Sequence, residues 1–132
     1  IEPERWGVWI SRANHSHPIL TDAVALAIHF LTDDQHDLAR HFGSLTGDEV
    51  DKFAGQVVEP AMPAEGPWAE HERPPLLLAC PTRIVGHRRA VLAGDTDHSC
   101  IVVEPVDVRA ADGFSPLHYR SVTDVTPGHP AH

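Results

Sequence analysis

The stretch "RIVGHRRAVLAGDTDHSCIVVEPVDVR", residues Arg83–Arg109, holds two long runs rich in β-branched residues around a short polar segment. The runs Arg83–Leu92 and His98–Arg109 predict strands, because β-branched side chains favour extended backbone. The segment Ala93–Asp97 between them combines glycine and aspartate, which is typical of a turn. The stretch therefore predicts an antiparallel pair of strands and a fold in which β-sheet dominates.

Further strands are expected on both sides of this pair. They are Arg5–Ser11, Val24–Leu31, a short one at Gln56–Glu59, Leu76–Cys80 and Pro116–Ser121. Val24–Leu31 is continuously apolar, which indicates a strand buried on both faces. Most of Gln56–Pro75, with five prolines, is expected to be a long loop.

Short helices are expected between these strands. His17–Ala23 has a proline near its start, as helices often do. Thr32–Gln35 matches a capping box, and Gly43 is expected to end the following helix in the left-handed conformation. Thr46–Glu49 repeats the capping signature for a second, shorter helix. The order of elements predicts a mainly β fold, a β-barrel or barrel-like sheet with helices inserted in one connection.

Length, net charge and the distribution of apolar residues narrow the class of protein. The 132 residues suit a single domain spanning 1–132, with residues 122–132 as a loose tail. A net charge of −9 argues against nucleic-acid binding. No apolar stretch approaches the roughly 20 residues that span a bilayer, so we expect no membrane insertion and a cytoplasmic protein. Cys80 and Cys100 lie in apolar surroundings and are expected to be buried free thiols.

A polar cluster follows the first expected strand. Residues 12–17 gather an arginine, an asparagine, a serine and two histidines just before a helix. Because helix N-termini attract anions and guanidinium suits phosphate, this cluster can form a phosphate site. Alternatively it is a polar turn, in which Ser16 or His17 caps the helix and Arg12 is solvated. Spacing alone favours the turn.

A second polar cluster, Gly94–Ser99, carries Asp97 beside His98 at the start of a strand. An aspartate in this place can orient the imidazole towards a ligand. The alternative is a turn whose aspartates and glycine serve only the backbone, and spacing alone again favours it.

Other chemistries lack their motifs. The chain has eleven histidines, but no H-E-x-x-H and no C-x-x-C, so no metal site is predicted. There is no G-x-S-x-G, no G-x-G-x-x-G and no Walker-type loop. A catalytic serine and a Rossmann nucleotide site are therefore not expected.

The order of "SRANHSHPIL", "FGSLTGDEVDKF" and "GDTDHS" resembles the flavin reductase-like family, in particular its small actinobacterial members. The resemblance covers Ile1–Arg109 and is most specific at Phe42–Phe53. It implies an FMN-binding split β-barrel with Greek-key antiparallel strands. It also implies a homodimer that holds FMN or FAD near the subunit interface. NADH or NADPH would deliver hydride to the flavin, and reduced flavin can pass to a partner monooxygenase.

The resemblance also assigns roles to residues. The cofactor-binding set that it implies is Arg12, Asn14, His15, Ser16, His17 and Lys52. The first four match the stretch along the flavin phosphate and ribityl chain, and Lys52 belongs to the helical segment near the cofactor. Asp97 and His98 match the catalytic acid and histidine of a G-D-H turn.

Two departures from the family pattern bear on these assignments. Thr96 stands where the family has the glycine before Asp-His. Family members also begin with a strand region and a Ser/Thr-bearing loop that grips the flavin, whereas the first residues of this chain match the part of the family pattern after that loop. A non-catalytic split barrel that binds flavin or another ligand is therefore the alternative function, and an interaction protein without cofactor is a third.

Overall fold

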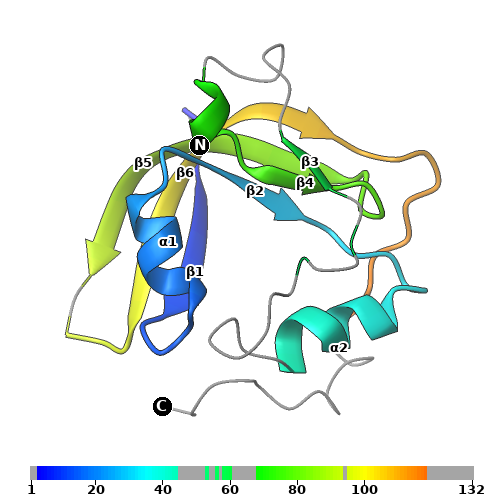
Figure 1. Cartoon of the computed structure of the whole chain (residues 1–132), viewed down its shortest axis with the longest axis horizontal. Helices are drawn as coiled ribbons and strands as arrows, with labels where there is room; N and C mark the ends of the chain where they lie inside the picture. The colour runs from blue at the N-terminus through cyan, green and yellow to red at the C-terminus, as the bar shows by residue number, and fades with distance from the viewer. Residues whose placement is uncertain are drawn as a thin grey trace.

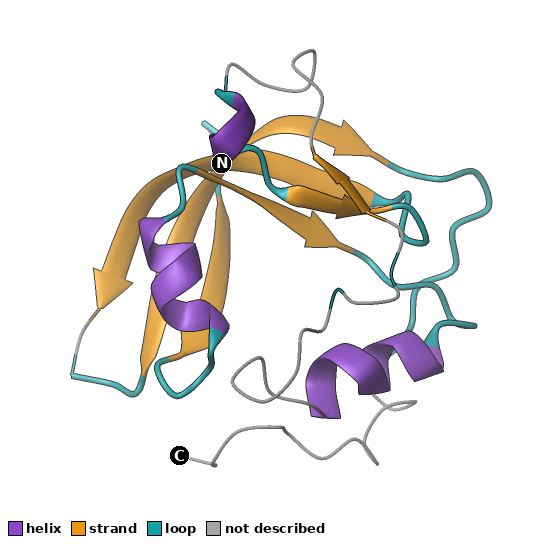
Figure 2. Cartoon of the chain, in the orientation of Figure 1, coloured by secondary structure: helices purple, strands orange, loops and turns teal. Residues whose placement is uncertain are grey.

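The computed structural model describes residues 3–44, 53, 56, 58–60, 68–93 and 95–118. Within these ranges the chain forms a curled antiparallel sheet, and two α-helices lie below its arch in the view of Figure 1. Figure 2 shows that strands make up most of the regular structure. The predicted mainly β fold with inserted helices is confirmed.

The main sheet has four strands, in the order β1 (Trp6–Ser11), β6 (His98–Arg109), β5 (Arg83–Ala93) and β2 (Ala25–His29). Each neighbouring pair is antiparallel, and the first strand lies beside the last, as a Greek-key arrangement requires. A second small sheet pairs β3 (Val58–Pro60) with β4 (Pro75–Leu77). A 3₁₀ turn, η2 (Glu70–Glu72), precedes β4.

The predicted pair of long strands is confirmed almost to the residue, since β5 extends only one residue beyond Leu92. Its register shifts twice, between Val85 and Gly86 and between Arg88 and Ala90. Such irregularities bend a strand and increase its twist. One lies near the start of β5 and the other at its middle, and Figure 1 shows β5 as a strongly curved strand.

Apolar side chains pack on both faces of β2. On one face Ala25 joins a cluster with Trp68, Leu76 and Val85. On the other face Leu26 joins a cluster with Ile10, Ile101 and Val103. Ala25 and Leu26 are both buried, so the prediction of a strand covered on both sides is confirmed there. The strand itself is shorter than predicted, because Val24, Phe30 and Leu31 lie outside it.

The predicted first helix is confirmed as α1 (Ser16–Asp22). The predicted capping box before α2 (His36–Ser44) is half correct. The Gln35 side-chain oxygen accepts from the Thr32 N–H at 2.9 Å, as predicted. However, the Thr32 hydroxyl bonds Asp34, and the Gln35 N–H donates to the Thr32 carbonyl oxygen instead.

The prediction that Gly43 ends this helix was wrong, because α2 continues to Ser44. Among the described glycines, positive φ occurs at Gly113, in the turn after β6. The neighbouring Phe42 ring packs edge-to-face on Phe53, with ring centroids 5.5 Å apart. Gly43 lies within α2 and does not have the left-handed conformation that would terminate the helix.

The remaining predictions agree with the structure in part. The strand predicted at 76–80 is β4, which ends at Leu77, where the chain turns and the Cys80 N–H bonds the Leu77 carbonyl. In the strand predicted at 116–121, Pro116 forms an isolated bridge with Thr32, and residues 119–121 lie outside the described residues. The helix predicted from Thr46 and the tail 122–132 also fall outside them, except for Phe53.

Both cysteines are buried free thiols, as predicted. Burial raises the pKa of the Cys80 thiol, against the opposing effect of its contact with Gln35. A thiol with a raised pKa is a poor nucleophile at neutral pH. Cys80 is thus part of the core and not a reactive site.

Candidate functional site

The two polar clusters predicted from the sequence lie together. The loop after β1 and the turn before β6 occupy the same end of the sheet, at the lower left of Figure 1. The Arg12 N–H donates to the carbonyl oxygen of Asp97 at 2.9 Å. One residue back, Ser11 pairs with His98 in the β1–β6 register. Strand pairing therefore joins the cofactor-binding and catalytic residues that the sequence proposed separately.

Asn14 shapes the loop between β1 and α1. Its side-chain oxygen accepts from the Ser16 N–H at 3.0 Å, and its carbonyl accepts from the His17 N–H at 3.0 Å. The next residue, Pro18, has no N–H to offer. The N–H groups of Ser16 and His17 are thus already bonded within the loop, so an anion here would depend mainly on side chains. Neither Ser16 nor His17 caps α1: His15 stands at the N-cap position, and its side chain makes no capping hydrogen bond.

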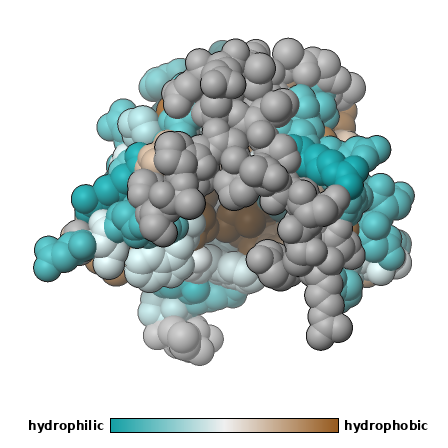
Figure 3. All heavy atoms as spheres, turned by 90° about the horizontal axis from the view of Figure 1, so that it is seen from below, coloured by the Kyte–Doolittle hydropathy of each residue, from teal (hydrophilic) through white to brown (hydrophobic). Residues whose placement is uncertain are grey.

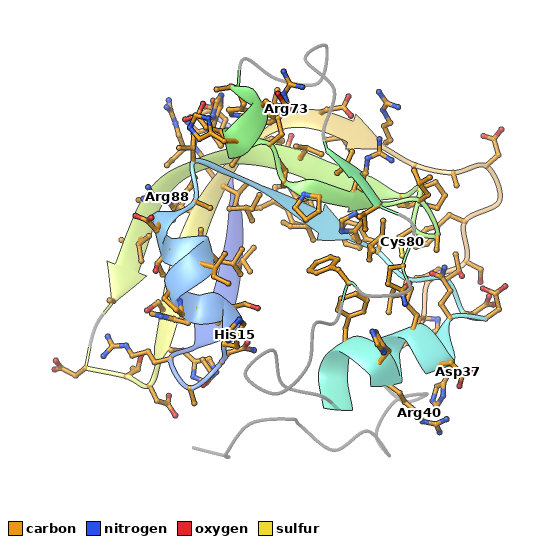
Figure 4. The ribbon with its side chains drawn as sticks, viewed as in Figure 1. His15, Asp37, Arg40, Arg73, Cys80 and Arg88 are labelled. Atoms are coloured by element: carbon orange, nitrogen blue, oxygen red, sulfur yellow. The ribbon has the colours of Figure 1, made fainter. Side chains whose placement is uncertain are left out.

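The side chains of the loop differ in how far a ligand can reach them. Arg12 and His15 are exposed, and Figure 4 shows His15 at the start of α1. Asn14, Ser16 and His17 are half-buried. His17 Nε2 lies 2.9 Å from the Oγ of Ser99, a buried residue of β6. The loop therefore presents one guanidinium, one imidazole and neutral polar groups at its surface.

Asp97 and His98 form a contact of their own. The Asp97 carboxylate lies 2.9 Å from Nδ1 of His98, and the two side chains are 43% and 44% exposed. The Thr96 hydroxyl donates to the His98 carbonyl at 2.9 Å and so helps to fix the turn. A carboxylate on one ring nitrogen sets the orientation of an imidazole and leaves the other nitrogen to face a ligand. Lys52, the remaining predicted site residue, lies outside the described residues.

A large cavity adjoins this loop, which the sequence did not predict. Its volume is about 1030 Å³, and it lies between α1, β2, α2 and the segment His71–Leu77. Apolar walls include Leu20, Leu38, Phe42 and Leu77, and its lining begins at Pro18, directly after the loop. Figure 3 shows hydrophobic atoms gathered in a recess at the centre of this side of the molecule. No local pattern could reveal it, because its walls come from four separate segments.

His29 is the polar side chain at the β2 wall of the cavity. Its Nε2 accepts a hydrogen bond from the Leu77 N–H at 3.0 Å, which ties β2 to β4. Burial lowers the pKa of His29, and the charge of Arg83, its register partner on β5, lowers it further. The neutral ring is required for this bond, since a protonated imidazole has no acceptor nitrogen.

We therefore expect the protein to lose stability as the pH falls through the range just below 6.5, the ordinary pKa of histidine. There the unfolded chain takes up a proton at His29 more readily than the folded chain, so protonation favours unfolding. The His29→Gln variant keeps an acceptor for the Leu77 N–H but does not titrate. Thermal unfolding between pH 7.5 and 5 should show a smaller loss for this variant than for the wild type. Equal losses would contradict the assignment to His29.

Neither a metal site nor a membrane-spanning helix is found among the described residues. Among them, no group of three or more histidine, cysteine, aspartate or glutamate side chains is arranged to hold a metal ion. Neither α-helix within the described ranges combines the length and the apolarity that crossing a bilayer requires.

Comparison with solved structures identifies the fold. A flavin reductase domain protein from Arthrobacter sp. FB24 superposes with a TM-score of 0.71 at 23% identity, over 98% of this chain and 71% of its own. An NADH:FAD oxidoreductase from Streptomyces globisporus C-1027 gives 0.69 at 18%, over 86% and 62%. An FMN-binding protein from Thermus thermophilus gives 0.67 at 24%, over 84% and 56%. These similarities confirm the predicted split-barrel fold.

The chain is shorter than many of these proteins, spanning 36%, 56% and 62% of the length of three of them. No match was found among the curated proteins. A family model described as a flavin reductase like domain matches residues 1–125, nearly the whole sequence. The motifs, the curled antiparallel sheet and this match agree, and the chain belongs to the flavin reductase-like family.

Proposed function

We propose that the protein is an FMN-binding flavin reductase, in which NADH or NADPH delivers hydride to the flavin. The observation that carries the proposal is the meeting of the Arg12–His17 loop with the Asp97–His98 turn at one end of the sheet. The Arg12–His17 loop would bind the cofactor phosphate. The Asp97–His98 turn would lie at the redox end of the site, where hydride is transferred. FAD is a second flavin that the same residues can serve.

The phosphate would be held by side chains of the loop. Arg12 and His15 are exposed at its surface, and Ser16, the first residue of α1, adds a hydroxyl. A guanidinium gives paired hydrogen bonds to phosphate oxygens, which a single ammonium cannot match. Asn14 also keeps its amide N–H groups as donors, because its side-chain oxygen is the atom that accepts from the Ser16 N–H.

The apolar part of the flavin fits the neighbouring cavity. Small-molecule sites have volumes of roughly 300–1,000 Å³ and mostly apolar walls with a few polar groups. The cavity, at about 1030 Å³, reaches the upper end of that range and is lined at Phe42 and Phe53 by aromatic rings. Bound flavin supplies the hydride-accepting chemistry itself, so the protein needs only to bind, orient and shield it.

Asp97 and His98 are the residues proposed to act at the redox end. The Asp97 carboxylate, on Nδ1, fixes the orientation of the imidazole. Nε2 would then face the nicotinamide or the flavin, within reach of a hydrogen bond. In this role His98 positions the hydride donor.

A homodimer is part of the same proposal. Trp9 and Leu92, 67% and 58% exposed, both pair with Cys100 in the register and so project from the same face of the sheet. The Ser11–His98 pair is the next on that face, which makes the apolar area continuous with the candidate site. An exposed apolar area beside a site is typical of a protein interface. A second copy of the chain is the proposed occupant, and a monooxygenase is the proposed recipient of reduced flavin.

The visible absorbance spectrum of the purified protein, followed by NADH and NADPH oxidation with added FMN or FAD, tests the function. A yellow protein, dimeric by light scattering, that oxidises either nicotinamide supports the proposal. A yellow protein without turnover supports the alternative, a non-catalytic flavin-binding barrel. The same alternative is favoured by Thr96, which stands in the turn where the family has glycine. A colourless protein that takes up neither flavin overturns both.

A further inference from the structure

Ser99 carries a buried hydroxyl beside the candidate site, although no motif marks it. The residue is only 1% exposed and follows His98 directly in β6. Its Oγ lies 2.9 Å from Nε2 of His17, which is 82 residues away in the sequence. The bond therefore joins the first turn of α1 to the strand that begins at the catalytic turn.

The surroundings of Ser99 would suit an apolar side chain. Strand alternation places it on the same face as Ile101, which is fully buried in the cluster with Ile10 and Leu26. A hydroxyl in such a place loses its contact with water and needs a partner. His17 is that partner, so the hydroxyl is explained by the position of His17 and not by packing.

A second bond anchors the other end of the same loop. The Arg12 N–H donates to the Asp97 carbonyl at 2.9 Å. The loop is thus held at its start by the residue before His98, and at its end by the residue after His98. Any shift of the loop relative to this imidazole must stretch one of the two bonds.

We propose that Ser99 and His17 are a positioning pair, which holds the Arg12–Ser16 loop at a fixed distance from His98. The proposal rests on the proposed function. In it His17 acts through Ser99 and is not itself a cofactor ligand, because its Nε2 is engaged inside the protein. The phosphate end and the redox end of the site are thereby coupled through one buried hydrogen bond.

Ser99→Ala should therefore weaken FMN binding about 3–10-fold, the range expected when one hydrogen bond of ordinary strength is lost. It should raise KM for the nicotinamide more than it lowers kcat, because the His98 imidazole, the group proposed to touch the substrate, is still present. Ser99→Thr keeps a hydroxyl and should restore most of the affinity. Ser115→Ala is the matched control, because it removes a hydroxyl that bonds Asp33 at 3.0 Å outside the site. It should change neither the FMN affinity nor the KM for the nicotinamide.

A double-mutant cycle separates a positioning role from direct contact. His17→Ala and the double variant with Ser99→Ala should bind FMN equally, since each removes the same bond. Additive losses, or a His17→Ala effect that is much larger and independent of Ser99, would make His17 a cofactor ligand and overturn the pair.

Imidazole ¹⁵N resonances of the flavin-free protein give a readout that does not depend on activity. The His17 Nε2 signal should move in Ser99→Ala and return towards the wild-type position in Ser99→Thr. An unmoved signal would show that the bond is absent and would overturn the inference. If the wild-type protein takes up no flavin, the proposed function fails; if it does and the cycle is additive, the positioning pair alone fails.

Discussion

Replacing Gly86 with alanine should lower the midpoint of thermal unfolding by about 5–15 °C, the effect of losing roughly 1–3 kcal/mol in a domain of this size. A Cβ at this position would lie 2.3 Å from the carbonyl oxygen of Glu104 and 2.9 Å from its carbon. It would also lie 2.7 Å from Cγ1 of Val103, which is fully buried. Backbone atoms of a paired strand cannot move aside as a flexible side chain can.

The loss of stability in Gly86→Ala arises at the centre of the sheet. Gly86 stands where the β5–β6 register shifts, so β6 can relieve the clash only by breaking pairing on both sides. Gly7→Ala is the matched control, because a Cβ there meets only the side-chain sulfur of Cys100, at 3.3 Å. Its midpoint should stay within about 2 °C of the wild type. A Gly86→Ala midpoint equally close to the wild type would show that this close approach does not constrain the sheet.

The position of Gly86 shows how far sequence can predict this fold. The strands Arg83–Ala93 and His98–Arg109 were predictable because the β-branched runs and the turn between them are local signals. The register shifts were not, because they depend on which residue of the opposite strand faces the bend. The prediction at Gly43 also failed, since α2 includes this glycine and continues to Ser44.

The candidate site was predictable in its parts but not in its assembly. Arg12 and His98 each belong to a recognisable polar cluster, yet only the pairing of β1 with β6 brings the clusters together. The contact of the Asn14 side-chain oxygen with the Ser16 N–H was not predicted, because spacing did not show how the loop would fold. Ser99 did leave a signal, since a polar residue at an inward position of an apolar strand calls for a buried partner. Its partner, His17, could be identified only from the tertiary structure.

Replacing Arg12 with alanine should raise the dissociation constant for FMN by about 10–100-fold. A hydrogen bond to a charged group contributes about 1.5–3 kcal/mol, and each 1.4 kcal/mol corresponds to a factor of ten. Arg12 lies on the loop that Asn14 and the Asp97 carbonyl hold in shape through the backbone. The Arg12→Ala variant should therefore keep the conformation of the loop and lose only the guanidinium. Fluorescence titration with FMN would measure the weaker binding.

The phosphate itself can be isolated by comparing FMN with riboflavin, which lacks it. If Arg12 binds phosphate, Arg12→Ala should weaken FMN binding but leave riboflavin affinity unchanged, and Arg12→Lys should give an intermediate FMN affinity, because it keeps the charge and loses the paired geometry. Rising salt should weaken FMN binding in the wild type more than in Arg12→Ala, since exposed charges are screened. Arg40→Ala, at an exposed arginine of α2 that pairs with Asp37, controls for the general loss of a positive charge. Equal losses for FMN and riboflavin would assign Arg12 to the flavin ring or to the loop structure, and would remove the phosphate from this end of the sheet.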